Sequence, residues 1–206
     1  MPCTIIDSYK QAPPAPQVQT IGSNGSTESI YPMYMYYKYG YFAFLYTNTE
    51  LGGAKQITKI AFNMLNTAPN TYTVNNQSLT FFHANENQFP TNLRNNMTSL
   101  STTWSISNET TVKSNFSWTI TSADTWYEIT LDTPFNYNGT DNLIIRWFNN
   151  FGTYLSGTAS NPTSYGDYTG SFLSYNDYSD YITDVPLTGY GTRDSTFRPQ
   201  IRITYI

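Results

Sequence analysis

Short segments rich in tyrosine, threonine, phenylalanine and isoleucine follow one another along this chain, and clusters of asparagine, glycine, proline, serine and aspartate separate them. The first group of residues favours a pleated, half-buried surface, and the clusters are typical of turns. No long window carries the apolar stripe of a helix. The pattern predicts strands at residues 30–39, 41–47, 57–65, 78–84, 101–107, 112–120, 125–133, 142–149, 153–158, 171–175 and 199–206.

Composition narrows the fold class further. Aromatic residues make up 17% of the 206 residues and charged residues only 12%. This excludes a disordered chain, which would have few aromatic residues and a high net charge. Turn clusters at short intervals are typical of antiparallel sandwiches and barrels. We therefore expect an all-β fold, an antiparallel jelly-roll-like β-sandwich, with an extended proline-rich arm over 1–20 and a single domain over 21–206.

The arm contains the sequence "QAPPAPQ", with Pro13 and Pro14 at its centre. Such a stretch favours an extended, polyproline-like conformation and cannot form a core of its own. We expect it to dock on something, either its own domain or a neighbouring subunit. The sequence leaves both possibilities open.

The stretch "YPMYMYYKYGYFAFLY", residues 31–46, does not alternate between apolar and polar positions. Both faces of a strand formed there would need cover. One face can pack on the core, and the other is expected to pack against a long loop, the arm or another protein chain. Tyrosine is enriched at interfaces because it buries a ring and keeps a polar tip. The interface candidates, unless they are simply core, are Tyr34, Tyr36, Tyr37, Tyr39 and Tyr41.

Other segments alternate clearly. In "WYEITLDT", Tyr127, Ile129 and Leu131 fall on one face, while the residues between them fall on the other. This period predicts a strand with one buried and one solvated face. The last segment, "PQIRITYI", has the same pattern, with isoleucines on one side and Arg202 and Thr204 on the other.

A second candidate surface lies at 164–184, "SYGDYTGSFLSYNDYSDYITD". Its few aliphatic residues predict a long loop, or a long connection that contains one short strand. Rings can stack on sugars while carboxylates accept hydroxyl protons, but the same mixture suits a protein-binding loop or a loop that packs on itself. The three interpretations remain open. The candidate binding residues are Tyr165, Tyr168, Tyr175, Tyr178, Tyr181, Asp167, Asp177 and Asp180, with Asp184 beside them.

The sequence carries no catalytic motif that we can identify. His83 ends an apolar run and suits a structural role, and one histidine with one cysteine, Cys3, cannot form an ordinary zinc site. Glu128 and Asp132 lie about 13 Å apart on one strand, too far for glycoside cleavage. We therefore expect no enzymatic activity and no cofactor.

Calcium is a possible ligand that the sequence does not predict. Asp132, Asp141 and Asp194 lie near expected turns, where carboxylate oxygens can hold Ca²⁺. Their spacing matches no calcium-binding loop, so no metal site is assigned.

Net charge is −4 and no basic run occurs, so a nucleic-acid partner is not expected. The apolar runs are too short to insert into a membrane. No secretory signal is recognised in the first residues, "MPCTIIDSYK". The expected partners are other copies of the chain or other proteins of an assembly, with a glycan as a further possibility.

Three stretches resemble a jelly-roll-like β-sandwich domain of large surface and secreted proteins of Bacteroidetes. The first is "YTNTELGGAKQITKIAF", in which Glu50, Leu51 and Gly52 fall on the family pattern. The others are "WYEITLDTPFNYNGTDNLIIRW" and "FRPQIRITYI", so the resemblance covers about 21–206. It implies adhesion, or carbohydrate or protein binding, usually as one module among many.

We expect the chain to depart from that family in two ways, as a lone module and without a secretion signal. A bacteriophage of such a host would need no signal, because virion proteins assemble in the host cytoplasm. We therefore expect a non-enzymatic structural or adhesive virion component, such as a head decoration, fibre or tail protein, anchored by its arm. The alternative is a carbohydrate-binding module at the cell surface or outside the cell.

Overall fold

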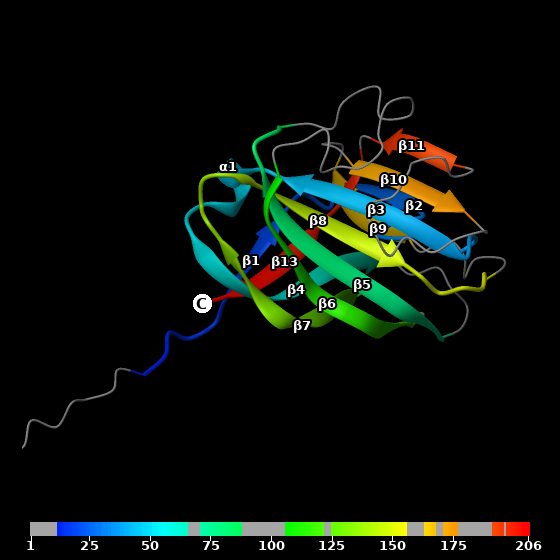
Figure 1. The fold of residues 1–206 in the computed structure, drawn as a ribbon, viewed down its shortest axis with the longest axis horizontal. Coiled ribbons are helices and arrows are strands. Elements are labelled where there is room, and N and C mark those ends of the chain that lie inside the picture. Colours follow the sequence, from blue (N-terminus) through cyan, green and yellow to red (C-terminus); the bar gives the residue numbers. More distant parts are fainter. Residues whose placement is uncertain are drawn as a thin grey trace, which may run out of the picture.

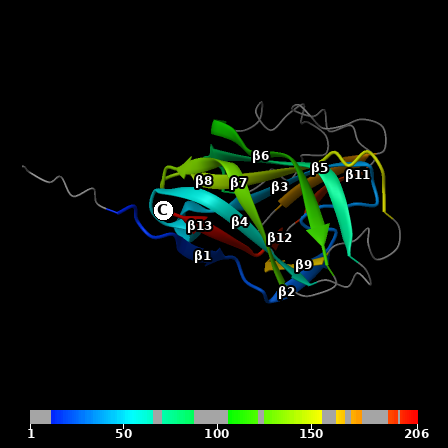
Figure 2. The same cartoon turned by 90° about the horizontal axis from the view of Figure 1, so that it is seen from below.

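Two antiparallel sheets packed face to face form a β-sandwich. The computed structural model describes residues 12–65, 71–87, 106–121, 125–155, 163–167, 171–176, 191–195 and 197–206, with residues 106, 171–176 and 191–195 described by their backbone alone. Figure 2 shows the layers, with β5, β6 and β8 in the upper one and β1, β2 and β9 in the lower one. The predicted fold class, an all-β sandwich, is confirmed.

The first layer, sheet A, has the path β1-β13-β4-β9-β12, with β2 on β9 and β7 on β4. The long strand β4 organises it, because β13 pairs with one of its edges and β7 with the other. The strands are β1 (Gln17–Ile21), β2 (Ser26–Ser29), β4 (Lys55–Leu65), β7 (Thr125–Tyr137), β9 (Thr163–Asp167), β12 (Arg198–Pro199) and β13 (Ile201–Tyr205).

The second layer, sheet B, has the order β11-β10-β3-β8-β5-β6. A one-turn helix, α1 (Asn48–Leu51), links β3 to β4 and so carries the chain from sheet B to sheet A. Thr47 and Glu50 form a reciprocal capping box that begins this helix. The strands are β3 (Tyr39–Tyr46), β5 (Tyr72–Ala84), β6 (Ile106–Ile120), β8 (Asn142–Asn149), β10 (Ser171–Asn176) and β11 (Gly191–Ser195).

Apolar side chains from the inner faces of both sheets form the core. Trp147 of β8 lies at its centre, with ring contacts to Phe62, Phe116 and Trp118. The alternation predicted for β7 and β13 is confirmed, because Ile129, Leu131, Ile201 and Ile203 are all buried. Their neighbours Glu128, Thr130 and Asp132 are exposed.

The strand predicted at 30–39 is wrong. Turns and bends occupy most of that stretch, and the regular strand β3 starts at Tyr39. Proline at position 32 follows a cis peptide bond, and the segment folds back so that Tyr31, Met33 and Met35 enter the core. Likewise, residues 153–155 form no strand, and residues 156–158 lie outside the described part of the chain.

The second face of β3 is covered within the chain itself, as one of the predicted alternatives allows. Every β3 residue after Tyr39 is buried within the single chain. Tyr41, Ala43 and Leu45 face away from the inter-sheet core, and the Tyr41 ring meets the edge of Phe148 on β8. Residues 12–16 of the arm are fully exposed, so this part of the arm does not cover β3.

Strand β1 overlaps the last residues of the predicted arm. It pairs antiparallel with β13, so that Gln17 lies opposite Tyr205 and Ile21 opposite Ile201. Before β1, the chain leaves the sandwich and projects away from it in both views (Figures 1 and 2). Among the described residues, no helix has the length and apolarity needed to cross a lipid bilayer.

Candidate functional site

A buried cluster of charges holds β12 against sheet B. The Arg198 side chain is 1% exposed. It forms ion pairs with Glu50 and Asp167 and donates to the Leu45 carbonyl oxygen at 2.9 Å. The guanidinium also lies over the Tyr46 ring, 4.8 Å from its centroid. Because every edge of the guanidinium contacts an acceptor, this buried charge is fully compensated.

The cluster changes the pKa values of its members. Burial alone would raise the pKa of Glu50, but hydrogen bonds from Arg198 and Thr47 outweigh it and hold that pKa below the ordinary value. Burial would lower the pKa of Arg198, yet the ion pairs with Glu50 and Asp167 raise it overall. Burial raises the pKa of Tyr46, whose hydroxyl donates to the Pro199 carbonyl oxygen. These three groups stabilise the fold, and Arg198 and Tyr46 are buried, while Glu50 keeps a partly exposed side chain.

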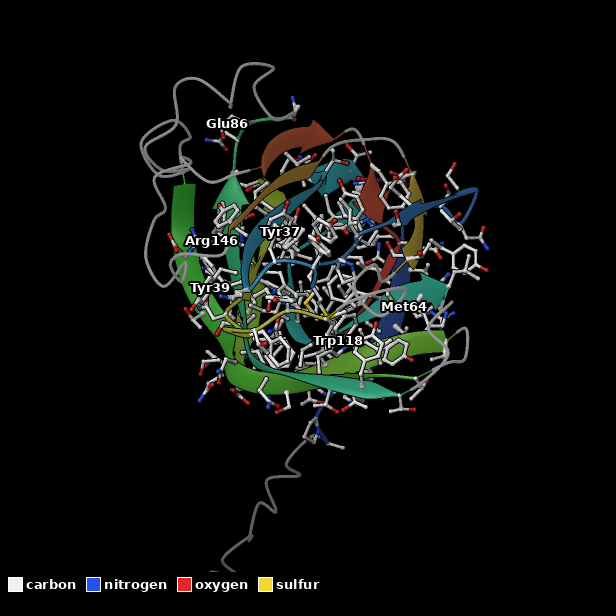
Figure 3. The ribbon with its side chains drawn as sticks, turned by 90° about the vertical axis from the view of Figure 1, so that its right-hand side faces the viewer. Tyr37, Tyr39, Met64, Glu86, Trp118 and Arg146 are labelled. Atoms are coloured by element: carbon white, nitrogen blue, oxygen red, sulfur yellow. The ribbon has the colours of Figure 1, made fainter. Side chains whose placement is uncertain are left out.

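A groove of about 410 Å³ lies on another side of the sandwich, between β6 and β7. These are edge strands, because β6 pairs only with β5 and β7 only with β4. They lie next to each other without a hydrogen-bonded ladder between them. Three rings line the groove, namely Phe116, Trp118 and Tyr127. Figure 3 shows Trp118 among the side chains of the sandwich interior.

Side-chain contacts bound the groove at both ends. At one end, Lys113 of β6 forms an ion pair with Asp132 of β7. At the other, the Thr121 N–H donates to the Tyr127 hydroxyl oxygen at 2.7 Å. The charge of Glu128 on the rim is balanced by Lys59 at 2.8 Å. The charges along the groove are therefore paired, and its lining favours an uncharged ligand.

Trp118 has an unused hydrogen-bond donor. It is 4% exposed, and its Nε1 has no acceptor. Trp147 is its neighbour, with 5.0 Å between ring centroids, and there Nε1 donates to Gln77 Oε1 at 2.8 Å. Buried tryptophan N–H groups usually have a partner. The two neighbouring core tryptophans thus differ in whether the described residues satisfy their indole N–H.

Tyrosines gather at one end of the sandwich, in the loop before β3 and the loop after β8. Tyr34 and Tyr36 stack at 5.9 Å, and Tyr37 meets both rings edge-on. Tyr36 is 51% exposed, and Tyr154 from the other loop is 57% exposed. Tyr37 and Tyr39 are labelled in the end-on view of Figure 3. Of the five tyrosines predicted as interface candidates, Tyr36 is exposed, Tyr34, Tyr37 and Tyr39 are half-buried and Tyr41 is buried.

The arm segment, defined here as Ala12–Pro16, is exposed at every residue. It includes the interface candidates Pro13 and Pro14. Among the described residues, the hydrogen bond that involves it is local, from Gln17 Nε2 to the Ala15 carbonyl oxygen. It continues into β1, where Val18 is 63% exposed. The segment thus extends from an edge strand without packing on the sandwich.

The stretch 164–184 is not one loop. Its start belongs to β9 in sheet A and its middle to β10 in sheet B, so these two segments lie in different layers. Tyr165 is half-buried, and Asp167 is held by Arg198 at 2.9 Å. Tyr175 lies on β10, for which only the backbone is described. The remaining candidates lie outside the described residues, namely Tyr168, Tyr178, Tyr181, Asp177, Asp180 and Asp184.

The other residues considered for chemistry have local partners. His83 is buried against Phe135 and accepts the Asn138 N–H through Nε2 at 3.1 Å. Burial lowers the pKa of His83, although Asp141 opposes this effect. Asp141 itself accepts from the Asn138 side chain at 2.7 Å. Asp194 lies on β11, whose side chains are not described. In the described part of the chain, no group of three His, Cys, Asp or Glu residues is placed to hold a metal.

Sequence reasoning missed the groove and the Arg198 cluster. The alternation of Phe116, Trp118 and Ile120 could have placed these residues on one face of a strand. It could not show that this strand lies at an edge beside another edge. The motifs "ELG" and "RP", which contain Glu50 and Arg198, lie far apart in the chain. Nothing in either motif indicates that their charges meet.

Comparison of the sequence with protein-family models found no match, and searches of curated proteins and of solved structures found no significant match. The resemblance to the Bacteroidetes surface domains therefore stays a prediction.

Proposed function

We propose that this protein is a non-enzymatic structural and adhesive subunit of a larger assembly, and that its arm anchors it to a neighbour. The observation that carries this proposal is the exposed arm segment on a packed sandwich. A proline-rich segment is stiff before it binds, so little conformational entropy is lost on docking. A partner would give this segment the contacts that its own sandwich does not provide.

The packing of the body supports the same proposal. Both faces of β3 are buried without help from residues 12–16. The carboxylates considered for catalysis, Glu128 and Asp132, are each bound by a lysine. The arm is thus free for assembly, and these acids serve as surface ion pairs. A phage virion, with assembly in the host cytoplasm, remains the setting that the sequence predicts.

Light scattering on the full chain and on a version lacking residues 1–16 tests the proposal. This truncation ends before β1 and so spares the β1–β13 ladder. We expect the full chain to form an oligomer that dissociates on truncation, with unchanged thermal unfolding of the sandwich. A monomer in both samples would refute self-assembly. An oligomer in both would refute the role of the arm.

A carbohydrate-binding module is the second candidate, and the exposed rings of Tyr36 and Tyr154 favour it. Stacked and edge-on tyrosines can present their faces to sugar C–H groups at this end of the sandwich. This location differs from the stretch 164–184 that the sequence suggested. Glycan-array binding that is lost in a Tyr36→Ala/Tyr154→Ala variant, by a monomeric protein, would favour the module over the assembly subunit.

A further inference from the structure

Strand β1 is the least protected edge strand in the described part of the chain. Edge strands expose unpaired N–H and C=O groups, and proteins usually guard them with charges, prolines or bulges. The sequence of β1, "QVQTI", has no charge and no proline, its ladder to β13 has no bulge, and its Val18 side chain is 63% exposed. The other edge strands of the two sheets, β2, β6, β7, β11 and β12, each carry a guard, for example Glu28, Lys113, Asp132, Arg193 and Pro199.

The hydrogen bonds of β13 show which way its backbone groups point. The Ile206 N–H and C=O both bond to Gln56, next to β4. Six residues earlier, the Gln200 C=O accepts from the Asn63 N–H of β4. Backbone groups of successive residues in a strand point to opposite edges. The even-numbered residues of β13 therefore face β4, and the odd-numbered ones face β1.

On β1, the same alternation leaves two residues facing the free edge. Gln17, Gln19 and Ile21 lie opposite the odd-numbered residues of β13 and bond to them. Val18 and Thr20 then point their N–H and C=O groups away from sheet A, and both residues are exposed. Among the described residues, no backbone partner is found for these outward groups. The free edge thus offers one donor and one acceptor at each of the two residues.

These outward groups complement a second copy of the same strand. If two β1 strands run antiparallel about a two-fold axis at Gln19, Val18 of each copy lies opposite Thr20 of the other. Each such pair can exchange two hydrogen bonds, so that no outward group of either residue is left unpaired. No charge on either strand opposes this contact.

Neighbouring residues exclude the two nearest registers. With the axis at Val18, Pro16 would lie opposite Thr20, and proline has no N–H to donate. With the axis at Thr20, Gly22 would lie opposite Val18. The Gly22 carbonyl oxygen already accepts from Gln200 Nε2 at 3.0 Å, and its φ of 82° lies outside the range of a strand. The first register is therefore the one that satisfies every outward group.

The same pairing places the arm segment of each copy beside the other copy. The arm segment precedes β1 and points away from its own sandwich (Figures 1 and 2). In an antiparallel pair it continues past Ile21 of the second copy, toward the exposed residues Ser23 to Gly25. The ladder alone would be weak, because water competes for its hydrogen bonds and association costs freedom of motion. Contacts of the arm segment are needed to supply the rest.

We propose that two copies of this protein pair antiparallel through β1, with a two-fold axis at Gln19, and that each arm segment lies on the other copy. This rests on the proposed assembly function and deepens it, because it names a second copy as the partner and β1 as the strand that directs the arm. The interface uses the same surface on both copies, so it closes at a dimer. The two A sheets become one continuous sheet.

Disulfide trapping tests the pairing and its register. The background is the full chain carrying Cys3→Ser, since Cys3 is its one cysteine. Gln19→Cys puts two thiols on the axis, where opposing Cα atoms are about 4.5 Å apart and within disulfide reach. Val18→Cys and Thr20→Cys are matched controls, because each cysteine would lie roughly 8–9 Å from its own copy, beyond that reach. We expect Gln19→Cys to cross-link at least about tenfold faster than either control under mild oxidation.

A proline substitution tests the hydrogen bonds of the ladder. Val18→Pro removes an outward N–H and spares the bonds to β13, and an edge strand tolerates proline where its N–H faces solvent. We expect sedimentation equilibrium to show a dimer dissociation constant raised at least about tenfold. Val18→Thr keeps the N–H and the branched shape, and should dimerise like the original chain. Thermal unfolding of each variant, Gln19→Cys included, verifies that the sandwich is intact.

The outcomes separate this proposal from the proposed function. If the full chain forms an oligomer that dissociates without residues 1–16, but Gln19→Cys cross-links no faster than its controls, the arm anchors elsewhere and the β1 pairing is wrong. Equal dimerisation of Val18→Pro and Val18→Thr would also overturn the pairing. If Gln19→Cys cross-links selectively and the truncated chain stays dimeric, the pairing stands and the role of the arm fails. A monomer without selective cross-linking would refute both and leave the β1 edge to a strand of a different protein.

Discussion

The Arg198 cluster and the β6–β7 groove are two ways of burying a polar group in one sandwich. Arg198 is a full charge, and two distant stretches of the chain supply its acceptors, Leu45 and Glu50 from one and Asp167 from the other. Trp118 is a neutral donor, and the described residues supply no acceptor for it. The two regions thus differ in whether folding alone completes their hydrogen bonds.

The difference follows from the energies involved. Leaving a buried charge unpaired would cost several kcal/mol, roughly the margin by which a domain is stable at all. An unused indole N–H costs about 1–3 kcal/mol, which a stable sandwich can tolerate. The sandwich therefore compensates the buried charge completely and leaves the less costly neutral donor without an acceptor among the described residues.

Removal of Arg198 should have the largest effect. An Arg198→Met variant leaves Glu50 and Asp167 without their shared cation, and we expect a loss of about 3–5 kcal/mol in the free energy of unfolding. Urea denaturation measures it. Arg202→Met is the matched control, because Arg202 lies over Trp126 on the outer face of the same region, and its loss should cost under about 1 kcal/mol. Equal losses in the two variants would show that the buried ion pairs of Arg198 stabilise the fold no more than the contact of Arg202 with Trp126.

The two neighbouring tryptophans allow a direct comparison. Trp147→Phe removes a similar ring area to Trp118→Phe but leaves the Gln77 side chain without its donor. We expect Trp147→Phe to be more destabilising by about 1–3 kcal/mol, the usual cost of an unpaired buried group. Urea denaturation of both variants gives the difference. A larger loss at Trp118 would mean that its N–H already has a strong partner in the free protein.

Acid should weaken the Arg198 cluster. The pKa of Glu50 is lower in the folded chain than its ordinary value of 4.5. A lowered pKa stabilises the fold above the unfolded value, and this contribution is lost as pH falls through the folded value. Unfolding free energy should therefore drop as pH falls below about 4.5, and drop less in Glu50→Gln. Identical pH profiles for the two proteins would contradict this assignment.

The smallest effect is expected at the groove rim. Lys59 and Glu128 form a solvent-exposed pair, with side chains 39% and 50% exposed. Lys59→Ala should change the unfolding free energy by less than about 1 kcal/mol, and less still at high salt. Differential scanning calorimetry at low and high salt measures this. A large loss of stability that persists at high salt would mean that the Lys59 side chain stabilises the fold through packing and not through its exposed ion pair.

The sequence predicts a strand correctly where the alternation of its own residues determines which face is buried. On β7, the alternation of Ile129 and Leu131 with exposed neighbours predicts the buried face correctly. It fails for the short polar strands β2 and β11, "STES" and "GTRDS", because their pairing partners determine them and their own residues do not. It also fails at Tyr31, where apolar residues enter the core from turns.

The candidate site was even less accessible to sequence. Tyr34, Tyr36 and Tyr37 could be named because they are adjacent in the chain. The groove joins Trp118 to Tyr127 only through the order of strands in two sheets, and Arg198 meets Glu50 across 148 positions. Such contacts depend on long-range pairing, for which a single sequence contains no local pattern.

The pairing of β1 with β13 also determines how the protein carries mechanical load. Gln17 and Tyr205 lie opposite each other at the same end of an antiparallel ladder. A force that pulls these two residues apart acts along the hydrogen bonds and opens them one after another, like a zipper, at low force. A force between the arm segment and the body of the sandwich pulls β1 lengthwise instead and loads all of the ladder's bonds together. A protein pulled by its arm against its body would therefore resist stretching far better than one pulled apart at Gln17 and Tyr205.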